Sequence, residues 1–260
     1  MKDITVIKIG GSTFGNRDTT IEDIVALQKK GKSLVVVHGG GGNVTEWLKR
    51  LGIETKFVRG ERVTDLPTLE VATAVLAGLS NKEITAAINV AGGKAVGISG
   101  IDGALVESRA KSKEMGYVGE VVKVNTAVLE TLLEAGFIPV VSSISLYSVD
   151  KPGDAPPMIN VNADPAAGDL AAAIGAGRLI FMTDVAGITG ASGKVLPKIS
   201  ANEAESLIAS GVIAGGMIPK VNACLKALKT GAITRIIDGR KPHALLKEFD
   251  GQEGGTTIEK

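Results

Sequence analysis

Two stretches, Ile4-Thr-Val-Ile-Lys-Ile-Gly-Gly11 and Ser33-Leu-Val-Val-Val-His-Gly-Gly-Gly-Gly42, decide the fold of this chain. Each is a nearly continuous run of apolar, mostly β-branched residues that ends in glycines. Such runs are typical of strands buried on both faces of a parallel sheet. Similar runs recur at residues 137–141, 178–183 and 234–238. These five segments are therefore predicted to be strands.

Amphipathic stretches with apolar spacings of three and four separate these strands and predict helices. The predicted helices cover residues 20–30, 43–51, 67–78, 80–91, 126–135, 164–174, 201–210 and 217–230. Several end at a glycine, which favours a left-handed C-terminal cap; Gly31, Gly78 and Gly136 are examples. Strands that alternate with helices predict an α/β fold, with helices on both faces of a mostly parallel sheet.

The middle of the sequence has a different pattern. Residues 54–63 and 96–124 hold short β-prone segments separated by glycines, which predict hairpins. The densest proline and glycine cluster, residues 150–157, is interpreted as a surface loop, after which strand-like sequence resumes at Met158. We expect a change of lobe shortly after this loop, and a last short strand after residue 255.

The composition excludes several classes of protein. The 260 residues include 29 Lys and Arg against 28 Asp and Glu, a net charge of +1 that argues against nucleic-acid binding. No apolar run approaches the roughly 20 residues of a membrane span. The single cysteine forms no intrachain disulfide, and two histidines are too few for a zinc cage. The N-terminus lacks a signal-peptide pattern, so we expect a cytoplasmic protein that binds no membrane.

The two glycine clusters are candidate anion sites. Gly10 and Gly11 follow the first strand, and Gly39 to Gly42 follow the second. Exposed N–H groups in such turns, often beside a helix N-terminus, bind anions at the carboxyl edge of a sheet. Neither cluster matches the dinucleotide fingerprint, and the chain has no P-loop. A plain tight turn is the alternative for one glycine pair, but four successive glycines exceed what a turn requires.

Two lysines occupy unusual positions. Lys8 lies inside an apolar strand, where a lysine is rarely buried without a partner, and an anion would be a natural one. Lys220 falls in the first turns of a predicted helix, where the helix dipole favours negative groups. A bound phosphate would account for both positions. The alternatives are an edge-strand lysine and a solvated helix-face lysine.

Other polar residues leave more alternatives open. In Asn160-Val-Asn-Ala-Asp164, Asn162 or Asp164 could cap a helix, and Asp164 could pair with a lysine. Arg62 could fork onto a substrate carboxylate or form a surface salt bridge. His38 is interpreted as a packed or capping residue rather than a general base. Asp184 could face a nucleotide or close a turn.

Taken together, eight segments of the chain resemble the amino acid kinase family, in the family's order and over essentially the whole length. They are Lys8-Ile-Gly-Gly11, Val37-His-Gly-Gly-Gly41, Gly60-Glu-Arg-Val-Thr64, Asn81-Lys82, Pro139-Val-Val141, Asn160-Val-Asn-Ala-Asp164, Thr183-Asp-Val-Ala-Gly-Ile188 and Gly216-Met-Ile-Pro-Lys-Val221. The resemblance implies a three-layer αβα sandwich around one continuous, mainly parallel sheet. It also implies an acceptor-binding and dimerisation lobe over residues 1–164 and an ATP-binding lobe over 165–260, which are not independent domains.

The resemblance assigns roles to residues of this chain. Lys8 and Lys220 match lysines that bind the transferring phosphoryl group, and Asp164 matches the aspartate that positions them. The glycine loops around the phosphates correspond to Gly10, Gly11, Gly40 and Gly41. The residues that hold the acceptor's α-carboxylate correspond to Arg62 and Asn160, and the nucleotide-side motif includes Asp184.

The implied activity is ATP-dependent phosphorylation of the γ-carboxylate of N-acetyl-L-glutamate in arginine biosynthesis, with Mg²⁺ held mainly by the nucleotide phosphates and no all-protein metal site. Ser12-Thr13-Phe14 departs from what we expect in every such enzyme, so an aminoadipate derivative of lysine biosynthesis remains an alternative acceptor. A non-catalytic nucleotide or amino-acid sensor is the alternative from another class. The chain starts almost at its first strand, without the helical extension of arginine-inhibited hexamers, so we expect a homodimer without arginine feedback.

Overall fold

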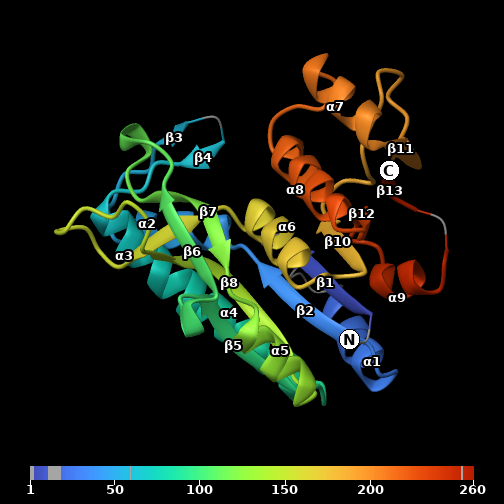
Figure 1. Ribbon diagram of the computed structural model, residues 1–260, viewed down its shortest axis with the longest axis horizontal. Helices are drawn as coiled ribbons and strands as arrows, with labels where there is room; N and C mark the ends of the chain where they lie inside the picture. Colours follow the sequence, from blue (N-terminus) through green and yellow to red (C-terminus); the bar gives the residue numbers. More distant parts are fainter. Residues whose placement is uncertain (1–2, 11–18, 59, 253) are drawn as a thin grey trace.

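The computed structural model describes residues 3–10, 19–58, 60–252 and 254–260. Within them, eleven strands form one sheet that runs through both halves of the molecule (Figure 1). β1 (Ile4–Ile9) lies near the middle of the sheet, between β2 (Ser33–His38) and β10 (Arg178–Thr183), and is parallel to both. The long apolar runs that predicted these strands are therefore buried in the centre.

The remaining strands extend the sheet on either side, in the order β11-β13-β12-β10-β1-β2-β8-β6-β7-β9, with β5 also paired to β8. They are β5 (Ala95–Gly100), β6 (Val106–Ala110), β7 (Val118–Val124), β8 (Ile138–Tyr147), β9 (Met158–Val161), β11 (Lys198–Ser200), β12 (Ile233–Asp238) and β13 (Thr256–Glu259). Most pairs are parallel, and the antiparallel ones are β6 with β7, β8 with β9, and β12 with β13. A separate hairpin joins β3 (Phe57–Val58) and β4 (Glu61–Arg62). The predicted hairpins in the middle of the chain are thus confirmed.

The described helices follow the predicted positions closely. They are α1 (Thr20–Lys29), α2 (Gly41–Arg50), α3 (Leu66–Thr73), the π-helical segment η1 (Ala74–Ser80), α4 (Asn81–Val90), α5 (Ala127–Glu134), α6 (Ala163–Ala173), α7 (Ala201–Ala209), α8 (Met217–Lys229) and α9 (Ala244–Phe249). Short 3₁₀ turns cover Asp102–Ala104 and Lys113–Met115.

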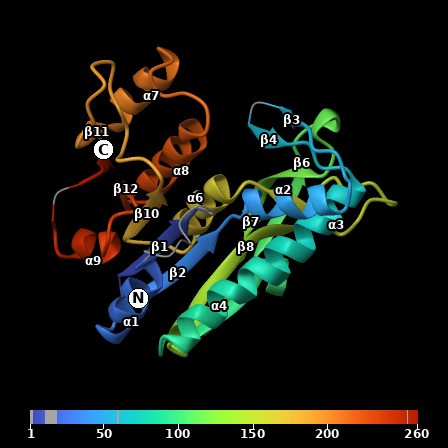
Figure 2. The same cartoon turned by 180° about the vertical axis from the view of Figure 1, so that it is seen from behind.

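Two apolar cores lie on opposite faces of the sheet and make the fold a three-layer αβα sandwich. Val35 and Val37 of β2 point into a core shared with α5, α6, α7 and α8, whereas Leu34 and Val36 point into one shared with α1, α4 and α9. This alternation follows from the two-residue period of a strand. Figures 1 and 2 show α6 and α8 on one side and α1 and α4 on the other. The predicted fold class is confirmed.

One predicted helix end is wrong. Gly78 was expected to end a helix, but it lies inside η1, and helical geometry continues from α3 through η1 into α4. The buried side chains of Val75, Leu76 and Ser80 lie in this segment, so packing holds it helical through the glycine. The sequence analysis also missed α9 and β11, which are too short to show a period.

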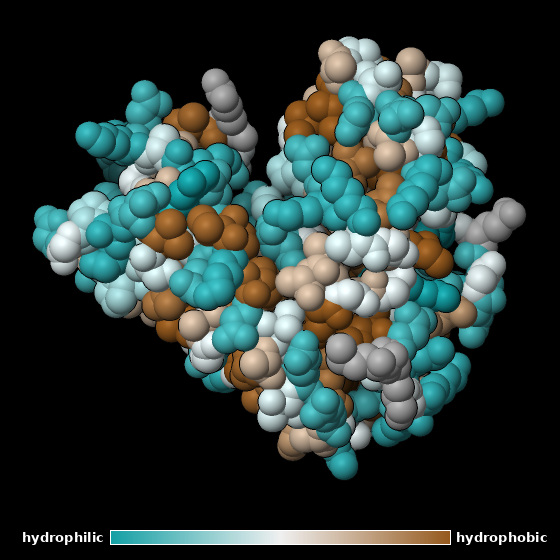
Figure 3. Space-filling view, viewed as in Figure 1, coloured by the Kyte–Doolittle hydropathy of each residue, from teal (hydrophilic) through white to brown (hydrophobic). Residues whose placement is uncertain are grey.

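The strand order creates a ligand-binding edge. From β1 the sheet continues through β2 in one direction and through β10 and β12 in the other. Ile9, at the end of β1, pairs with His38 of β2 and with Met182 of β10, so the three strands end at the same level. Ligands of open α/β sheets bind at such a switch point, beyond the carboxyl ends of the strands. Figure 3 shows the surface hollowed between the two halves of the molecule.

Candidate active site

Two lysines from opposite halves of the chain share one carboxylate. The Nζ of Lys8 in β1 lies 2.6 Å from Oδ1 of Asp164, and the Nζ of Lys220 in α8 lies 2.6 Å from its Oδ2. Lys8 and Asp164 are buried, at 7% and 5% exposure. β1 is an interior strand, which excludes the edge-strand interpretation of Lys8. The structure thus brings together three residues that the sequence had singled out separately.

The electrostatics of this cluster favour an additional anion. Burial alone would raise the pKa of the Asp164 carboxyl, but the charges of Lys8 and Lys220 outweigh burial and hold the pKa below its usual range. The cluster therefore carries two positive charges and one negative charge. Asp164 also lies in the first turn of α6, whose N-terminus adds partial positive charge.

The helix start at α6 resolves the ambiguity in its sequence. The side chain of Asn162 accepts a hydrogen bond from the backbone N–H of Asp164 at 3.0 Å, so Asn162 is the N-cap. Asp164 is thereby released from capping and pairs with the two lysines instead. The cap fixes the first turn of α6, and this turn sets the position of the shared carboxylate.

The glycine loop after β2 forms one wall of the site. Gly40 has a φ of 151°, and a side chain there would clash with Leu76, because an added Cβ would lie 2.8 Å from its Cδ2. Helix α2 begins at Gly41, two residues earlier than predicted, so its N-terminus faces the site. Gly10 follows β1 at the same edge, and the predicted phosphate-binding Gly11 lies outside the described residues.

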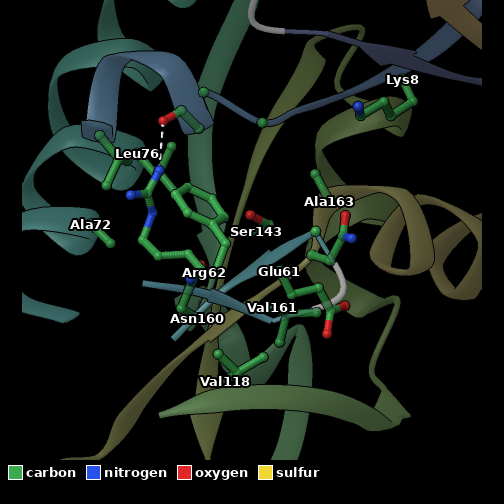
Figure 4. Close-up of a pocket in the computed structure, with 17 residues that line it drawn as sticks. Lys8, Glu61, Arg62, Ala72, Leu76, Val118, Ser143, Asn160, Val161 and Ala163 are labelled. Atoms are coloured by element: carbon green, nitrogen blue, oxygen red, sulfur yellow. Dashed lines mark hydrogen bonds between the residues drawn. The ribbon is translucent and has the colours of Figure 1, made fainter. Parts of the chain in front are cut away.

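A pocket of about 270 Å³ adjoins Lys8 and the glycine loop. This volume is at the lower end for ligand pockets, which suits a small metabolite. Its apolar walls come from Val44, Phe57, Ala72, Leu76 and Val118. Polar groups line it at Arg62, Ser143, Asn160 and the backbone of Gly39 to Gly41. Figure 4 shows Lys8 on one side of the pocket and Arg62 on the other.

Arg62 is held in place while part of its guanidinium stays available. Its Nη2 donates to the carbonyl of Gly41 at 2.9 Å and to Oγ1 of Thr45 at 2.8 Å. The guanidinium lies over the ring of Phe57, with Cζ 4.7 Å from the ring centroid. Its Nη1 is buried and has no hydrogen-bond partner among the described residues. An unsatisfied buried donor in a pocket is suited to an acceptor from a ligand, such as a carboxylate.

Asn160 lies near the end of β9 and lines the same pocket. Its Nδ2 donates to Oγ1 of Thr64 at 3.3 Å, which links β9 to the segment that follows Arg62. The structure therefore brings together Asn160 and Arg62, which the resemblance had assigned to one carboxylate. Ser143 and Val118 line the pocket as well, although the sequence gave no chemical signal for either of them.

Asp184 is a predicted site residue that lies outside both this pocket and the cluster of Lys8, Asp164 and Lys220. It is exposed, just after β10, at the carboxyl edge of the C-terminal half. The pKa of Arg240 is raised mainly by side-chain hydrogen bonds to Asp238, and the charge of Asp184 raises it further. Its position is compatible with a nucleotide-facing group, but no described contact joins it to the lysine cluster.

His38 does not have the properties of a general base. It is 1% exposed, and burial lowers the pKa of its imidazole from 6.5 to about 4, with a smaller effect from the charge of Lys8. Its Nδ1 lies 2.8 Å from the carbonyl of Gly39. The interpretation as a packed residue is confirmed.

The match to known proteins is consistent with this geometry. The model of the amino acid kinase family matches residues 3–238, and the chain belongs to that family. The acetylglutamate kinase of Dehalococcoides mccartyi is 49% identical over 255 residues, which cover 98% of this chain and 94% of that protein. The acetylglutamate kinase of a Nostoc species is 48% identical over 262 residues, which cover 97% of this chain and 86% of that protein.

A solved structure is similar over the same extent. The N-acetylglutamate synthase of Neisseria gonorrhoeae, crystallised with coenzyme A and N-acetyl-glutamate, superposes with a TM-score of 0.84 at 27% identity. The match covers 99% of this chain and 59% of the synthase chain. In the described part of this chain, no helix is both long and apolar enough to cross a membrane.

Proposed function

We propose that this protein phosphorylates the γ-carboxylate of N-acetyl-L-glutamate with ATP, giving N-acetyl-L-glutamyl 5-phosphate and ADP, as a step of arginine biosynthesis. The observation that carries the proposal is the cluster of Lys8, Asp164 and Lys220 beside a small pocket that ends at Arg62. Relatives at 45–49% identity over nearly the full chain are acetylglutamate kinases, which supports this choice of acceptor.

The pocket suggests how the acceptor binds. The free Nη1 of Arg62 and the amide of Asn160 would bind its α-carboxylate, and the apolar walls would contact its methylenes and acetyl group. The γ-carboxylate would then extend toward Lys8 and the loop of Gly40 and Gly41. Lys8 and Arg62 lie on different sides of the pocket, so each carboxylate of the acceptor would meet its own cation (Figure 4).

The reaction needs charge neutralisation more than proton transfer. A γ-carboxylate has an unperturbed pKa of about 4.3 and is ionised at neutral pH, so no general base is required. An anion must still approach a polyanionic phosphate, and catalysis therefore depends on positioning and electrostatic stabilisation. Lys8 and Lys220 would neutralise the phosphoryl oxygens from two sides. Backbone N–H groups at Gly10, Gly40 and Gly41 would donate hydrogen bonds where negative charge develops.

We place the nucleotide over the lobe of residues 165–260 and the acceptor over the lobe of residues 1–164. Lys220, in the first turn of α8, joins the cluster from the C-terminal half, and Asp184 follows β10 in the same half. No group of three or more His, Cys, Asp or Glu side chains in the described ranges could hold a metal ion. Mg²⁺ would therefore be held mainly by the phosphates of ATP, where it supplies further charge neutralisation.

We also propose that the enzyme is a cytoplasmic homodimer. The side of the N-terminal lobe that carries η1 and α4 exposes apolar side chains, with Leu79 at 41% and Val90 at 88% exposure. Burying such side chains against a second copy would be favourable. Light scattering of the purified protein should give the mass of two chains, and the mass of one chain would contradict this part of the proposal.

The activity assay compares acceptors with purified protein, ATP and Mg²⁺. N-acetyl-L-glutamate should give rapid turnover, with the acyl phosphate trapped as its hydroxamate. N-acetyl-L-aminoadipate, L-glutamate and UMP should be much poorer acceptors. Turnover on aminoadipate instead would move the function to the lysine branch, and ATP binding without turnover on any acceptor would indicate a sensor.

A further inference from the structure

Asn81, at the start of α4, does not line the pocket, yet its side chain is entirely buried and its amide groups are hydrogen-bonded. Its exposure is 0%. The two hydrogens of its Nδ2 are shared among three acceptors, which are Nε2 of His38 at 3.1 Å, the carbonyl of Val140 at 2.8 Å and that of Ile98 at 3.1 Å. It therefore connects α4 to three strands, and through His38 it reaches the glycine loop.

The neighbouring Lys82 and the two carbonyls together determine which way the amide of Asn81 points. The Nζ of Lys82 can only donate, and it lies 3.2 Å from Oδ1 of Asn81 and 2.7 Å from the carbonyl of Gly97. The oxygen of the amide is thereby fixed on the side of Lys82. The NH₂ group must then face His38, where it donates to Nε2.

The same donor order fixes the tautomer of His38. Its Nε2 accepts from Asn81, so this nitrogen carries no proton in the neutral ring. The proton is on Nδ1, which donates to the carbonyl of Gly39 at 2.8 Å. The ring is neutral at physiological pH because burial lowers its pKa to about 4. The chain of donors thus runs from Lys82 through Asn81 and His38 to the Gly39 carbonyl.

Fixing this carbonyl also fixes an N–H group of the anion-binding loop. In a planar trans peptide, the carbonyl of Gly39 and the N–H of Gly40 point in opposite directions. His38 alternates with Val37 along β2, so its side chain lies on the α4 face, whereas Lys8 lies on the α6 face. A Gly39 carbonyl drawn toward His38 therefore directs the Gly40 N–H toward the side of Lys8 and the pocket.

The space for this arrangement depends on a glycine in β5. A Cβ added at Gly97 would lie 2.1 Å from Oδ1 of Asn81, 2.5 Å from Oγ1 of Thr85 and 3.0 Å from Nζ of Lys82. The missing side chain of Gly97 thus lets the amide of Asn81 reach His38.

We propose that Lys82, Asn81 and His38 are positioning residues that set the Gly39–Gly40 peptide so that the Gly40 N–H meets the transferred phosphoryl group. The role of these residues in catalysis rests on the proposed phosphoryl transfer. The assignment of the His38 tautomer does not depend on that function. None of the three residues needs to touch substrate. The neutral Nδ1–H form of His38 is the feature through which they act.

The first experiment reads the tautomer directly by ¹⁵N NMR of the imidazoles. The chain has two histidines, so the signals can be assigned with a His243 variant. His38 should be the Nδ1–H form at neutral pH, and Asn81→Ala should introduce the Nε2–H form. Wild-type protein with Nε2–H at His38, or an unchanged tautomer in Asn81→Ala, would overturn the proposal.

The matched control is Asn89→Ala on the same helix. Asn89 also bridges α4 to β5, through Nδ2 to the Ala95 carbonyl at 3.2 Å and through the Ala95 N–H to its Oδ1 at 2.7 Å. It lies eight residues from Asn81, which is about 12 Å along a helix. Asn81→Ala should lower kcat at least tenfold, and Asn89→Ala less than twofold. Equal losses in the two variants would indicate a merely structural role.

The second experiment makes the effect depend on pH. In Asn81→Asp, the new carboxylate would accept a hydrogen bond from Nε2–H of His38 and raise the pKa of its imidazole. The positive charges of Lys8 on β1 and Lys82 on α4 would oppose this rise in pKa, and β8 contributes only uncharged groups. At low pH the imidazolium of this variant still donates from Nδ1–H to the carbonyl of Gly39. At higher pH the neutral ring keeps its proton on Nε2, so its Nδ1 lone pair faces that carbonyl and the hydrogen bond is lost. The kcat of Asn81→Asp should therefore fall as pH rises, relative to wild type.

If the ratio of kcat for Asn81→Asp to kcat for the wild type stayed constant across pH, the positioning role of Asn81 and His38 would be refuted. Gly97→Ala, which displaces the amide without removing it, should also lose the Nδ1–H form and lower kcat. An inactive wild-type protein with the Nδ1–H tautomer would instead contradict the proposed function and leave the His38 assignment standing.

Discussion

Lys8 and Lys220 bind the same carboxylate at the same distance, 2.6 Å, but they are supported differently. Lys8 belongs to an interior strand paired on both sides, at Val37 and at Phe181. Lys220 belongs to α8, which reaches the site by packing on α6, and its side chain is 20% exposed against 9% for Lys8. The comparison indicates that the N-terminal half of the chain presents a fixed charge, and the C-terminal half a charge whose position depends on helix packing.

The largest effect should come from removing either lysine. Lys8→Met and Lys220→Met should each lower kcat by about 10²- to 10³-fold, the cost of losing one group that stabilises transition-state charge. The loss should be greater for Lys8, because its more buried charge acts in a lower effective dielectric. Steady-state kinetics measures kcat of the two variants, and a titration with ATP measures their nucleotide binding, some of which should remain.

Lys123→Met is the matched control, because this exposed lysine of β7 pairs with Glu107 of β6, away from the site. It should leave kcat unchanged. Full turnover by Lys8→Met would refute the phosphoryl-binding role, and a larger loss at Lys220 would reverse the comparison of the two lobes.

Arg62→Lys tests the end of the pocket opposite Lys8. Lysine keeps the charge but cannot bind Gly41 and Thr45 while still offering a nitrogen to a carboxylate. Losing one charge-assisted hydrogen bond of about 1.5–3 kcal/mol should raise KM for N-acetyl-L-glutamate by roughly 10- to 150-fold. KM for ATP should change little, and an equal rise in both constants would contradict an acceptor-specific role.

A pH titration of stability examines the buried imidazole of His38. His38 has its pKa lowered from 6.5 to about 4, so the unfolded chain binds a proton there more readily than the folded protein does. The free energy of unfolding should therefore decrease as pH falls from about 6.5 to about 4, by about 3 kcal/mol in total from this group. Urea unfolding across this range should show a smaller decrease in His38→Gln, and identical slopes would refute the assignment.

The smallest effect should come from the packing that supports Lys220. A Cβ added at Gly168 in α6 would lie 2.8 Å from the Cα and Cβ of Ala223 in α8. Gly168→Ala should cost about 1–3 kcal/mol of stability by overpacking, and should lower kcat modestly by shifting α8. Gly78→Ala, where nothing lies within 4 Å of the added Cβ, is the control and should be neutral or slightly stabilising. A stable, fully active Gly168→Ala would show that Lys220 does not depend on this contact.

Much of the fold could be predicted because its strands carry strong, local patterns. The segments 4–9, 33–38 and 178–183 were placed to the residue, since interior strands are apolar on both faces. The continuous helix through η1 could not be predicted from Gly78, because the outcome depends on tertiary packing of Val75 and Leu76.

The candidate site was predictable where a residue conflicts with its surroundings. Lys8 in an apolar strand needed a partner, and the structure provides Asp164. Ser143 and Val118 were not predictable, because a serine or a valine in a strand carries no signal until the pocket is assembled. The hydrogen bond between Arg62 and Gly41 joins β4 to the start of α2, and no sequence pattern couples their positions.

The carboxylate between the two lysines also bears on product release. Two lysines without it would hold a phosphate dianion with nearly matched charge, and would retain ADP or the acyl phosphate after transfer. Asp164 offsets one of the two positive charges. In the proposed reaction it would share its lysines with the bound anion and so moderate the affinity for reactants and products alike, leaving binding energy for the transition state. On this proposal, the carboxylate would favour rapid turnover over tight binding.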